Sequence, residues 1–195
     1  MTTRQKTNAN LLIEAQPDLQ VIAKVEKMQR GYVDKWHKHP WHQVIFPFDG
    51  ILQSKVANHQ YVVPHGGVLF IPADTYHESF VITETKFIGI YLNPQINIEY
   101  PLTTNAATST PLIRELILHI AEAYSPPDSK QKDDNAIKVL DMLFTLIKES
   151  GSYNMTLLLP CDRRLKLIFN ELIQDLQLDK KLSDWAKQVG ASERT

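Results

Sequence analysis

The sequence predicts a mainly β N-terminal barrel or sandwich, followed by α-helices and then by the start of a helix-turn-helix. Between residues 19 and 100, short apolar runs alternate with turn residues, as they do in all-β domains. From residue 110 onward, the apolar residues recur at helical spacing. Residues 182–195 combine a short apolar period, a glycine turn and a serine that can cap a helix, which is the pattern of a helix-turn-helix.

The composition is that of a folded protein with no strong charge. The 195 residues suit one domain and part of a second, and 43% of them are hydrophobic. A formal net charge of −1 excludes a global basic field that would attract nucleic acid. One cysteine, Cys161, allows no internal disulfide, and the sequence shows neither a signal peptide nor a long apolar span. We therefore expect a cytoplasmic protein with no membrane segment.

The N-terminal part is expected to be an arm followed by a barrel. Residues 1–18 are polar and have no sustained period, so we expect an extended arm in which only residues 11–13 dock. Residues 19–100 are expected to form the β domain. Asp49 and Gly50 both tolerate positive φ and predict a hairpin turn. The predicted strands centre on the apolar runs 44–46, 51–56, 61–63, 68–71, 80–82 and 87–92.

A histidine-rich stretch inside this domain points to binding. In a β-strand, alternate side chains share a face, so the odd-numbered residues from 37 to 43 would point the same way. These residues are His37, His39, Trp41 and Gln43. Neutral imidazole is a common metal ligand, and two on one strand need only one or two further donors. His77, which follows another strand-like run, is the obvious third histidine.

These residues stand at the spacing of two sequence motifs, which resemble those of the cupin family of small jelly-roll barrels (double-stranded β-helices). The first motif is matched by Gly31, His37, His39, Gln43 and Gly50, with Gln43 in place of an acid. The second is matched by Gly66, Pro72 and His77, whereas Asp74 and Val81 replace its glycine and asparagine. The resemblance implies a metal site formed by His37, His39 and His77, with Gln43 as a weak oxygen ligand or as a group that orients the others.

Three interpretations of this site stay open from the sequence. The first is a divalent-metal site, for which zinc, iron, nickel and manganese are all compatible with nitrogen-rich ligation. The second is a metal-free effector pocket in which Trp41 and the three histidines contact a small molecule. The third is a set of structural histidines, although three converging imidazoles are costly to bury without a partner. We favour the metal site. The remaining histidines, His42, His59, His65 and His119, are predicted to be structural or on the surface.

Residues 101–152 are expected to form a helical connection. Thr110 can cap a helix that begins with Pro111, and a second helix is predicted to end near Gly151. The predicted apolar stripes are Leu112, Ile113, Leu116, Ile117, Ile120 and Tyr124 in the first helix, and Ile137, Leu140, Leu143, Phe144 and Ile147 in the second. These stripes either pack on the barrel or form a homodimer interface, and the sequence leaves both open.

Residues 153–195 are expected to contain a linker and a first helix-turn-helix. The linker carries the apolar residues 157–159, and Asp162 can cap the helix that follows. A shorter helix, a glycine turn and Ser192 as the cap of a further helix complete the pattern. The residues expected to begin the DNA-contacting helix are Ser192, Glu193, Arg194 and Thr195.

Together with the cupin-like motifs upstream, this region resembles the AraC-type (AraC/XylS family) transcriptional regulators. The resemblance implies a cupin sensor that binds a small-molecule effector, connecting helices that often dimerise, and a DNA-binding domain of two helix-turn-helix units. Only the beginning of the recognition helix is present here, and base readout requires such a helix in the major groove. We therefore expect DNA to be a partner only of a full-length form with both units.

An enzymatic role is the alternative. Three protein ligands leave positions open on a metal, as a stand-alone cupin metalloenzyme such as a dioxygenase or an isomerase requires. The sequence shows no catalytic nucleophile motif, phosphate-binding glycine loop or pair of acids at useful spacing. We therefore expect a sensor without catalytic residues.

Overall fold

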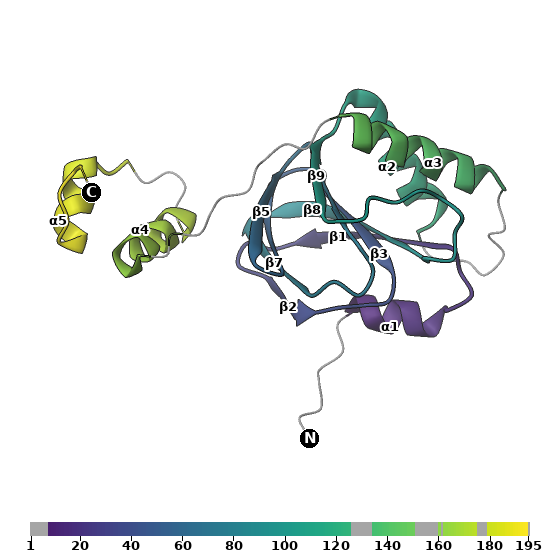
Figure 1. Cartoon of the computed structure of the whole chain (residues 1–195), viewed down its shortest axis with the longest axis horizontal. Helices are drawn as coiled ribbons and strands as arrows, with labels where there is room; N and C mark the ends of the chain where they lie inside the picture. The colour runs from purple at the N-terminus through teal and green to yellow at the C-terminus, as the bar shows by residue number, and fades with distance from the viewer. Residues whose placement is uncertain (1–7, 126–133, 151–159, 161, 175–178, 195) are drawn as a thin grey trace, which may run out of the picture. The chain divides into compact units, whose positions relative to one another are not determined.

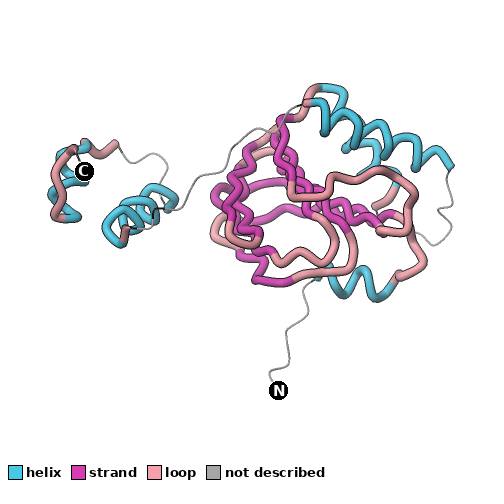
Figure 2. The backbone as a smooth tube through the Cα atoms, in the orientation of Figure 1, coloured by secondary structure: helices cyan, strands magenta, loops and turns pink. Residues whose placement is uncertain are grey.

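The structure is a computed structural model, which describes residues 8–125, 134–150, 160, 162–174 and 179–194 (Figures 1 and 2). The chain divides into two compact units, Met1–Thr156 and Leu157–Thr195. None of the described helices is long and apolar enough to cross a membrane.

The first unit is built on two antiparallel sheets that form a barrel, which confirms the predicted fold class (Figure 2). One sheet has the strand order β1-β8-β3-β6-β9 and the other has the order β2-β7-β4-β5. The strands are β1 (Val21–Met28), β2 (Val33–His37), β3 (His42–Pro47), β4 (Ile51–Val56), β5 (His59–Pro64), β6 (Gly67–Ile71), β7 (His77–Thr83), β8 (Thr85–Leu92) and β9 (Asn105–Thr108).

The chain passes from one sheet to the other at most of its turns, so the predicted hairpin at Asp49-Gly50 is wrong. These two residues do form a turn, but they join β3 of one sheet to β4 of the other. The hairpin in this region lies between β4 and β5, where Val56 pairs with His59 across a two-residue loop and Ala57 has a φ of 50°. A glycine turn thus serves equally well as a corner between sheets.

The five-stranded sheet separates two apolar layers. On β3, Ile45 faces the barrel interior and packs in a cluster with Leu52, whereas Val44 and Phe46 face outward. The outward side is covered by α2 (Pro111–Ala123) and α3 (Asp134–Glu149), which lie along one side of the barrel in Figure 1. The period of two along the strand therefore divides its residues between the interior and the helices.

The two helices bury most of their predicted stripes within the chain. The Thr110 hydroxyl accepts a hydrogen bond from the Ile113 amide at 3.2 Å, as the capping prediction requires. Ile117 and Leu143 are fully buried, and the Phe144 ring contacts the Phe70 ring edge-on at a centroid distance of 5.3 Å. Since these buried side chains already pack on the sheet, they are not free to form a dimer interface, whereas Leu112 of the first predicted stripe is 46% exposed.

Two boundaries differ from the sequence-based predictions. The expected extended arm is instead partly helical, because α1 (Asn8–Ala15) buries Ala9 and Ile13 against the barrel. The barrel also continues past residue 100, because β9 pairs with β6 in the part of the connecting segment that precedes its first predicted helix. The β9 sequence, Asn-Ala-Ala-Thr, has almost no strand-forming residues, so its place depends on the open edge of β6.

The second unit contains α4 (Arg163–Gln174) and α5 (Leu182–Val189). The Asp162 carboxylate accepts a hydrogen bond from the Arg164 amide at 2.7 Å, which fits its predicted capping role. Lys180 lies over the buried Trp185 ring, with Nζ 4.2 Å from the ring centroid. The predicted linker residues 157–159 and Cys161 lie outside the described residues.

Candidate metal centre and barrel cavity

Three histidines from distant parts of the sequence come together inside the barrel. His37 ends β2, His77 begins β7, and the two residues are directly paired across the four-stranded sheet. His39 lies two residues further on, in the segment that leads to β3. One ring nitrogen of each lies within 4.8 Å of the others, and all three side chains are buried. The structure thus brings together the two motifs at the residues that the resemblance implies as ligands.

Each imidazole ring is oriented by a backbone carbonyl. Nδ1–H of His37 donates to the Lys35 carbonyl at 2.7 Å. In the same way, Nδ1–H of His39 donates to the Trp41 carbonyl at 2.7 Å, and Nδ1–H of His77 donates to the Thr75 carbonyl at 2.8 Å. Because a carbonyl only accepts, the proton of each neutral ring lies on Nδ1, and Nε2 keeps its lone pair. Nε2 of His37 and of His77 is buried and has no hydrogen-bond partner among the described residues. Such lone pairs suit a cation.

Burial also keeps the rings in the form that binds metal. Burial is the main cause that lowers the pKa of His77 to about 3, and the charges of His37 and His39 act in the same direction. Burial likewise lowers the pKa of His39, against the opposing effect of its hydrogen bonds. Both rings are therefore neutral near pH 7, as ligation requires.

Gln43 faces this group from the opposite sheet. Its Oε1 lies 3.2 Å from Nε2 of His39, and its amide NH₂ donates to the Tyr91 hydroxyl at 3.4 Å. With the His39 proton on Nδ1, the two close atoms both carry lone pairs. Either the amide turns to donate an N–H to His39, or a cation accepts both lone pairs. Gln43 therefore lies where an additional oxygen ligand would stand.

Trp41 does not join the group. Its side chain is buried in a small cluster with Ile13 of α1, Ile22 of β1 and Tyr91 of β8, and it does not line the barrel cavity. The reasoning from strand parity was wrong because residues 38–41 are not in a strand. They connect β2 and β3, which belong to different sheets, so alternation does not continue from His37 to Gln43. Trp41 contributes to the site through its backbone carbonyl, which accepts the hydrogen bond from His39.

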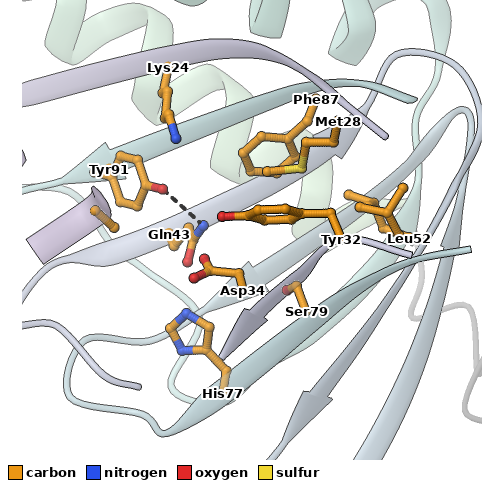
Figure 3. A pocket seen from close by; sticks show the side chains of 12 residues that line it. Lys24, Met28, Tyr32, Asp34, Gln43, Leu52, His77, Ser79, Phe87 and Tyr91 are labelled. Carbon is orange, nitrogen blue, oxygen red and sulfur yellow. Dashed lines mark hydrogen bonds between the residues drawn. The ribbon is translucent and has the colours of Figure 1, made fainter. Parts of the chain in front are cut away.

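A cavity of about 20 Å³ is lined by His77 and Gln43 together with apolar and polar residues (Figure 3). Its apolar side includes Leu52 and Phe87. Its polar side contains residues that sequence reasoning missed, namely Lys24, Tyr32, Asp34, Ser79 and Tyr91. This volume is close to what one water molecule needs, so a larger ligand requires side chains to move.

Asp34 was missed because a β-bulge changes the strand parity. In a regular strand, residues 34 and 37 would face opposite sides. Here Asp34 pairs with Ser79 and His37 pairs with His77, so β2 uses three residues where β7 uses two. Both Asp34 and His37 therefore face inward, with Oδ1 of Asp34 3.9 Å from Nδ1 of His37. Burial raises the pKa of the Asp34 carboxyl, and nearby His37 and Lys24 oppose that effect.

The other histidines lie away from the centre, as predicted. Nδ1 of His42 accepts a hydrogen bond from the Ala73 amide at 3.0 Å, and its ring stacks on Tyr100 at a centroid distance of 4.2 Å. His59, His65 and His119 are exposed.

The predicted DNA-contacting residues follow the glycine turn but do not begin a helix among the described residues. Gly190 ends α5 with a φ of 64°, the left-handed conformation that such a turn needs. Ser192, Glu193 and Arg194 are exposed, and the last two form a turn. Thr195 lies outside the described residues.

Sequence-level searches find no relative: no family model matches the chain, and neither does any curated protein. Solved structures do match. ToxT from Vibrio cholerae strain SCE256 with a bound unsaturated fatty acid aligns with 96% of this chain and 72% of its own, at 10% identity and a TM-score of 0.51. ToxT from Vibrio cholerae O395 bound to (E)-4-(8-methylnaphthalen-1-yl)but-3-enoic acid aligns with 89% and 73%, at 8% identity and a TM-score of 0.50.

An RmlC-like cupin from Shewanella frigidimarina covers 39% of this chain and 68% of its own, at 20% identity and a TM-score of 0.37. At such identities the likeness concerns the fold alone. The ToxT structures match both the β domain and the helices that follow it, so the chain has a fold of this kind along nearly its whole length.

Proposed function

We propose that this chain is the effector-sensing portion of an AraC-type transcriptional regulator, acting in the cytoplasm. The observation that carries the proposal is a histidine-lined barrel followed by helices, in a fold that matches ToxT, an AraC-family regulator, over 96% of the chain. Both ToxT structures hold a carboxylic acid with an apolar body. We infer that the barrel of this chain likewise binds a small molecule, whose binding alters the helices packed on the sheet.

A metal ion is part of this proposal because the residues present fit one. His37, His39 and His77 would hold it through Nε2, with Oε1 of Gln43 as a weaker ligand. The fit rests on the buried Nε2 atoms of His37 and His77, which have no hydrogen-bond partner among the described residues. A bound ion would supply a positive charge and open positions for an oxygen-bearing effector. Zinc, iron, nickel and manganese all accept such nitrogen-rich ligation.

Elemental analysis of the purified, untagged chain tests the metal site. We expect about one ion per chain after incubation with zinc, iron or nickel and removal of the excess. A His37→Ala/His39→Ala variant should lose the ion. A His59→Ala/His65→Ala variant is the matched control, because it removes two exposed histidines and should keep the ion. An unmodified chain that takes up no metal would leave the barrel as a metal-free effector pocket.

DNA recognition belongs, in this proposal, to a form of the protein with complete helix-turn-helix units. The described residues after α5 offer a turn and no helix that could enter the major groove. We expect no sequence-specific gel shift with this chain alone. A specific shift that competitor DNA of another sequence does not remove would contradict this.

A cupin metalloenzyme is the second candidate, and the polar groups around the cavity are the observation that favours it. Asp34, Tyr32 and Lys24 line the same space as His77, where a substrate would meet the open positions of an ion. Oxygen consumption by the iron-loaded chain, supplied with small carboxylic acids and diols, distinguishes the two functions. Turnover that His77→Ala abolishes would favour the enzyme, whereas saturable binding without turnover would favour the sensor.

A further inference from the structure

The proposed metal ligands carry no negative charge. Three neutral imidazoles and one amide face the centre, and position 43, which holds an acid in the motif that the sequence resembles, is a glutamine. Carboxylate groups raise the affinity of a site for divalent cations because they offset the charge of the ion. A site with neutral ligands alone would leave both charges of the ion uncompensated in a buried space.

Asp34 of β2 places a carboxylate beside this centre from a position outside the motif. The β-bulge between Asp34 and His37 turns both residues to the interior of the barrel. In Figure 3 the Asp34 carboxylate lies between Gln43 and His77, and all three residues line the same small cavity. The side chain of Asp34 is only 30% exposed, so its charge is weakly screened.

The other charged groups nearby do not explain the position of Asp34. Lys24 lines the cavity, but its Nζ forms an ion pair with Glu26 at 2.5 Å. Among the described residues, the basic side chain in contact with Asp34 is His37, whose Nδ1 lies 3.9 Å from Oδ1 of Asp34 and already donates to the Lys35 carbonyl. A partly buried carboxylate with no cation in direct contact among the described residues is costly, and a metal ion at the histidines would lower that cost.

We propose that Asp34 supplies the negative charge that position 43 lacks. Its carboxylate would offset the charge of the ion held by His37, His39 and His77. The inference rests on the proposed metal site. Asp34 is a positioning residue: it acts on the ion through the water-sized space between them, which one hydrogen-bonded water or effector oxygen can fill.

The test is calorimetric titration of the full chain with Zn²⁺. We expect Asp34→Asn, which keeps the shape and removes the charge, to weaken Zn²⁺ binding by about 10- to 100-fold. Adding Gln43→Glu to Asp34→Asn should recover most of that loss, because the carboxylate then stands at the motif position. Rescue from a different strand is not expected if Asp34 only stabilises the fold.

Glu78→Gln is the matched control, since it removes a negative charge next to His77 from a residue outside the cavity lining, and its Zn²⁺ affinity should change by less than about threefold. Near-UV circular dichroism checks that each variant is folded, and Asp34→Ser serves in place of Asp34→Asn if the latter is not. Unmodified chain that binds no Zn²⁺ would overturn the metal site and this inference together. Unmodified chain and Asp34→Asn with equal affinities would overturn only the role of Asp34.

Discussion

At the scale of single residues, the chain separates side chains that bind from side chains that pack. The buried histidines bring one ring nitrogen each close to the others, whereas the ring of Trp41, which is equally buried, packs in a hydrophobic cluster. Its cluster joins α1 to strands β1 and β8, so its contribution is to stability. The hydrogen bond from Nδ1 of His39 uses the Trp41 backbone, which any residue at that position provides.

Replacement of Trp41 by alanine should therefore be costly for stability. We expect Trp41→Ala to lower the free energy of unfolding by about 3 to 5 kcal/mol, because the ring leaves a cavity under α1. Urea denaturation followed by circular dichroism measures this loss. Trp36→Ala is the control: its ring is 44% exposed and stacks on Tyr76, so the loss should be about 1 kcal/mol. Equal losses in the two variants would show that Trp41 is not a core residue.

At the scale of elements, the glycine positions of the two motifs serve the turns. Gly31, Gly50 and Gly66 all have positive φ, and Asp74, which stands where the second motif has glycine, has a φ of 57°. The Asp74 amide donates to the His39 carbonyl at 2.9 Å, so this turn also holds the segment that carries a ligand. The spacing of the motifs thus reflects corners between sheets as much as metal ligation.

Substitution of Gly50 tests whether the motif glycines are required by the turns between the sheets. A Cβ at position 50 would overlap the Glu84 carbonyl oxygen and come within 2.9 Å of the Thr85 Cβ, whereas a Cβ at Gly31 meets nothing within 4 Å. Gly31→Ala should cost about 1 to 2 kcal/mol of unfolding free energy through its left-handed backbone alone. Gly50→Ala should cost about 1 to 3 kcal/mol more, because β3 or β8 must shift. Denaturant midpoints compare the two variants, and a milder Gly50→Ala would contradict the packing described here.

At the scale of the whole molecule, α2 and α3 would both cover the sheet and form the interface if the chain forms the homodimer that the resemblance implies. The buried face of α2 and α3 belongs to the fold of one chain, since Phe144 is 1% exposed. Apolar residues of the same helices remain outside this core, with Leu112 exposed by 46% and Met142 by 47%. A dimer would therefore use this outer side and leave the packing on the sheet unchanged.

Light scattering at micromolar concentration tests the dimer. We expect twice the 22.4 kDa of one chain for the unmodified protein. A Leu112→Glu/Met142→Glu variant should scatter as a monomer with an unchanged melting temperature, because both side chains are exposed. Lys138→Glu, an exposed change on α3 that removes no apolar surface, is the control and should remain a dimer. An unmodified chain that is monomeric at every concentration would refute the homodimer.

The sequence by itself determined the elements with strong local signals. The helical period and the Thr110 cap gave α2, the apolar runs gave most strands, and two motifs indicated which three histidines would meet. The tertiary structure decided the rest: the change of sheet after Gly50, the addition of β9, the packing of Trp41 and the inward turn of Asp34. Each of these features depends on how strands that are distant in the sequence pair with one another. One inserted residue in a strand pair reverses which side chains face inward, and a local sequence pattern does not contain that information.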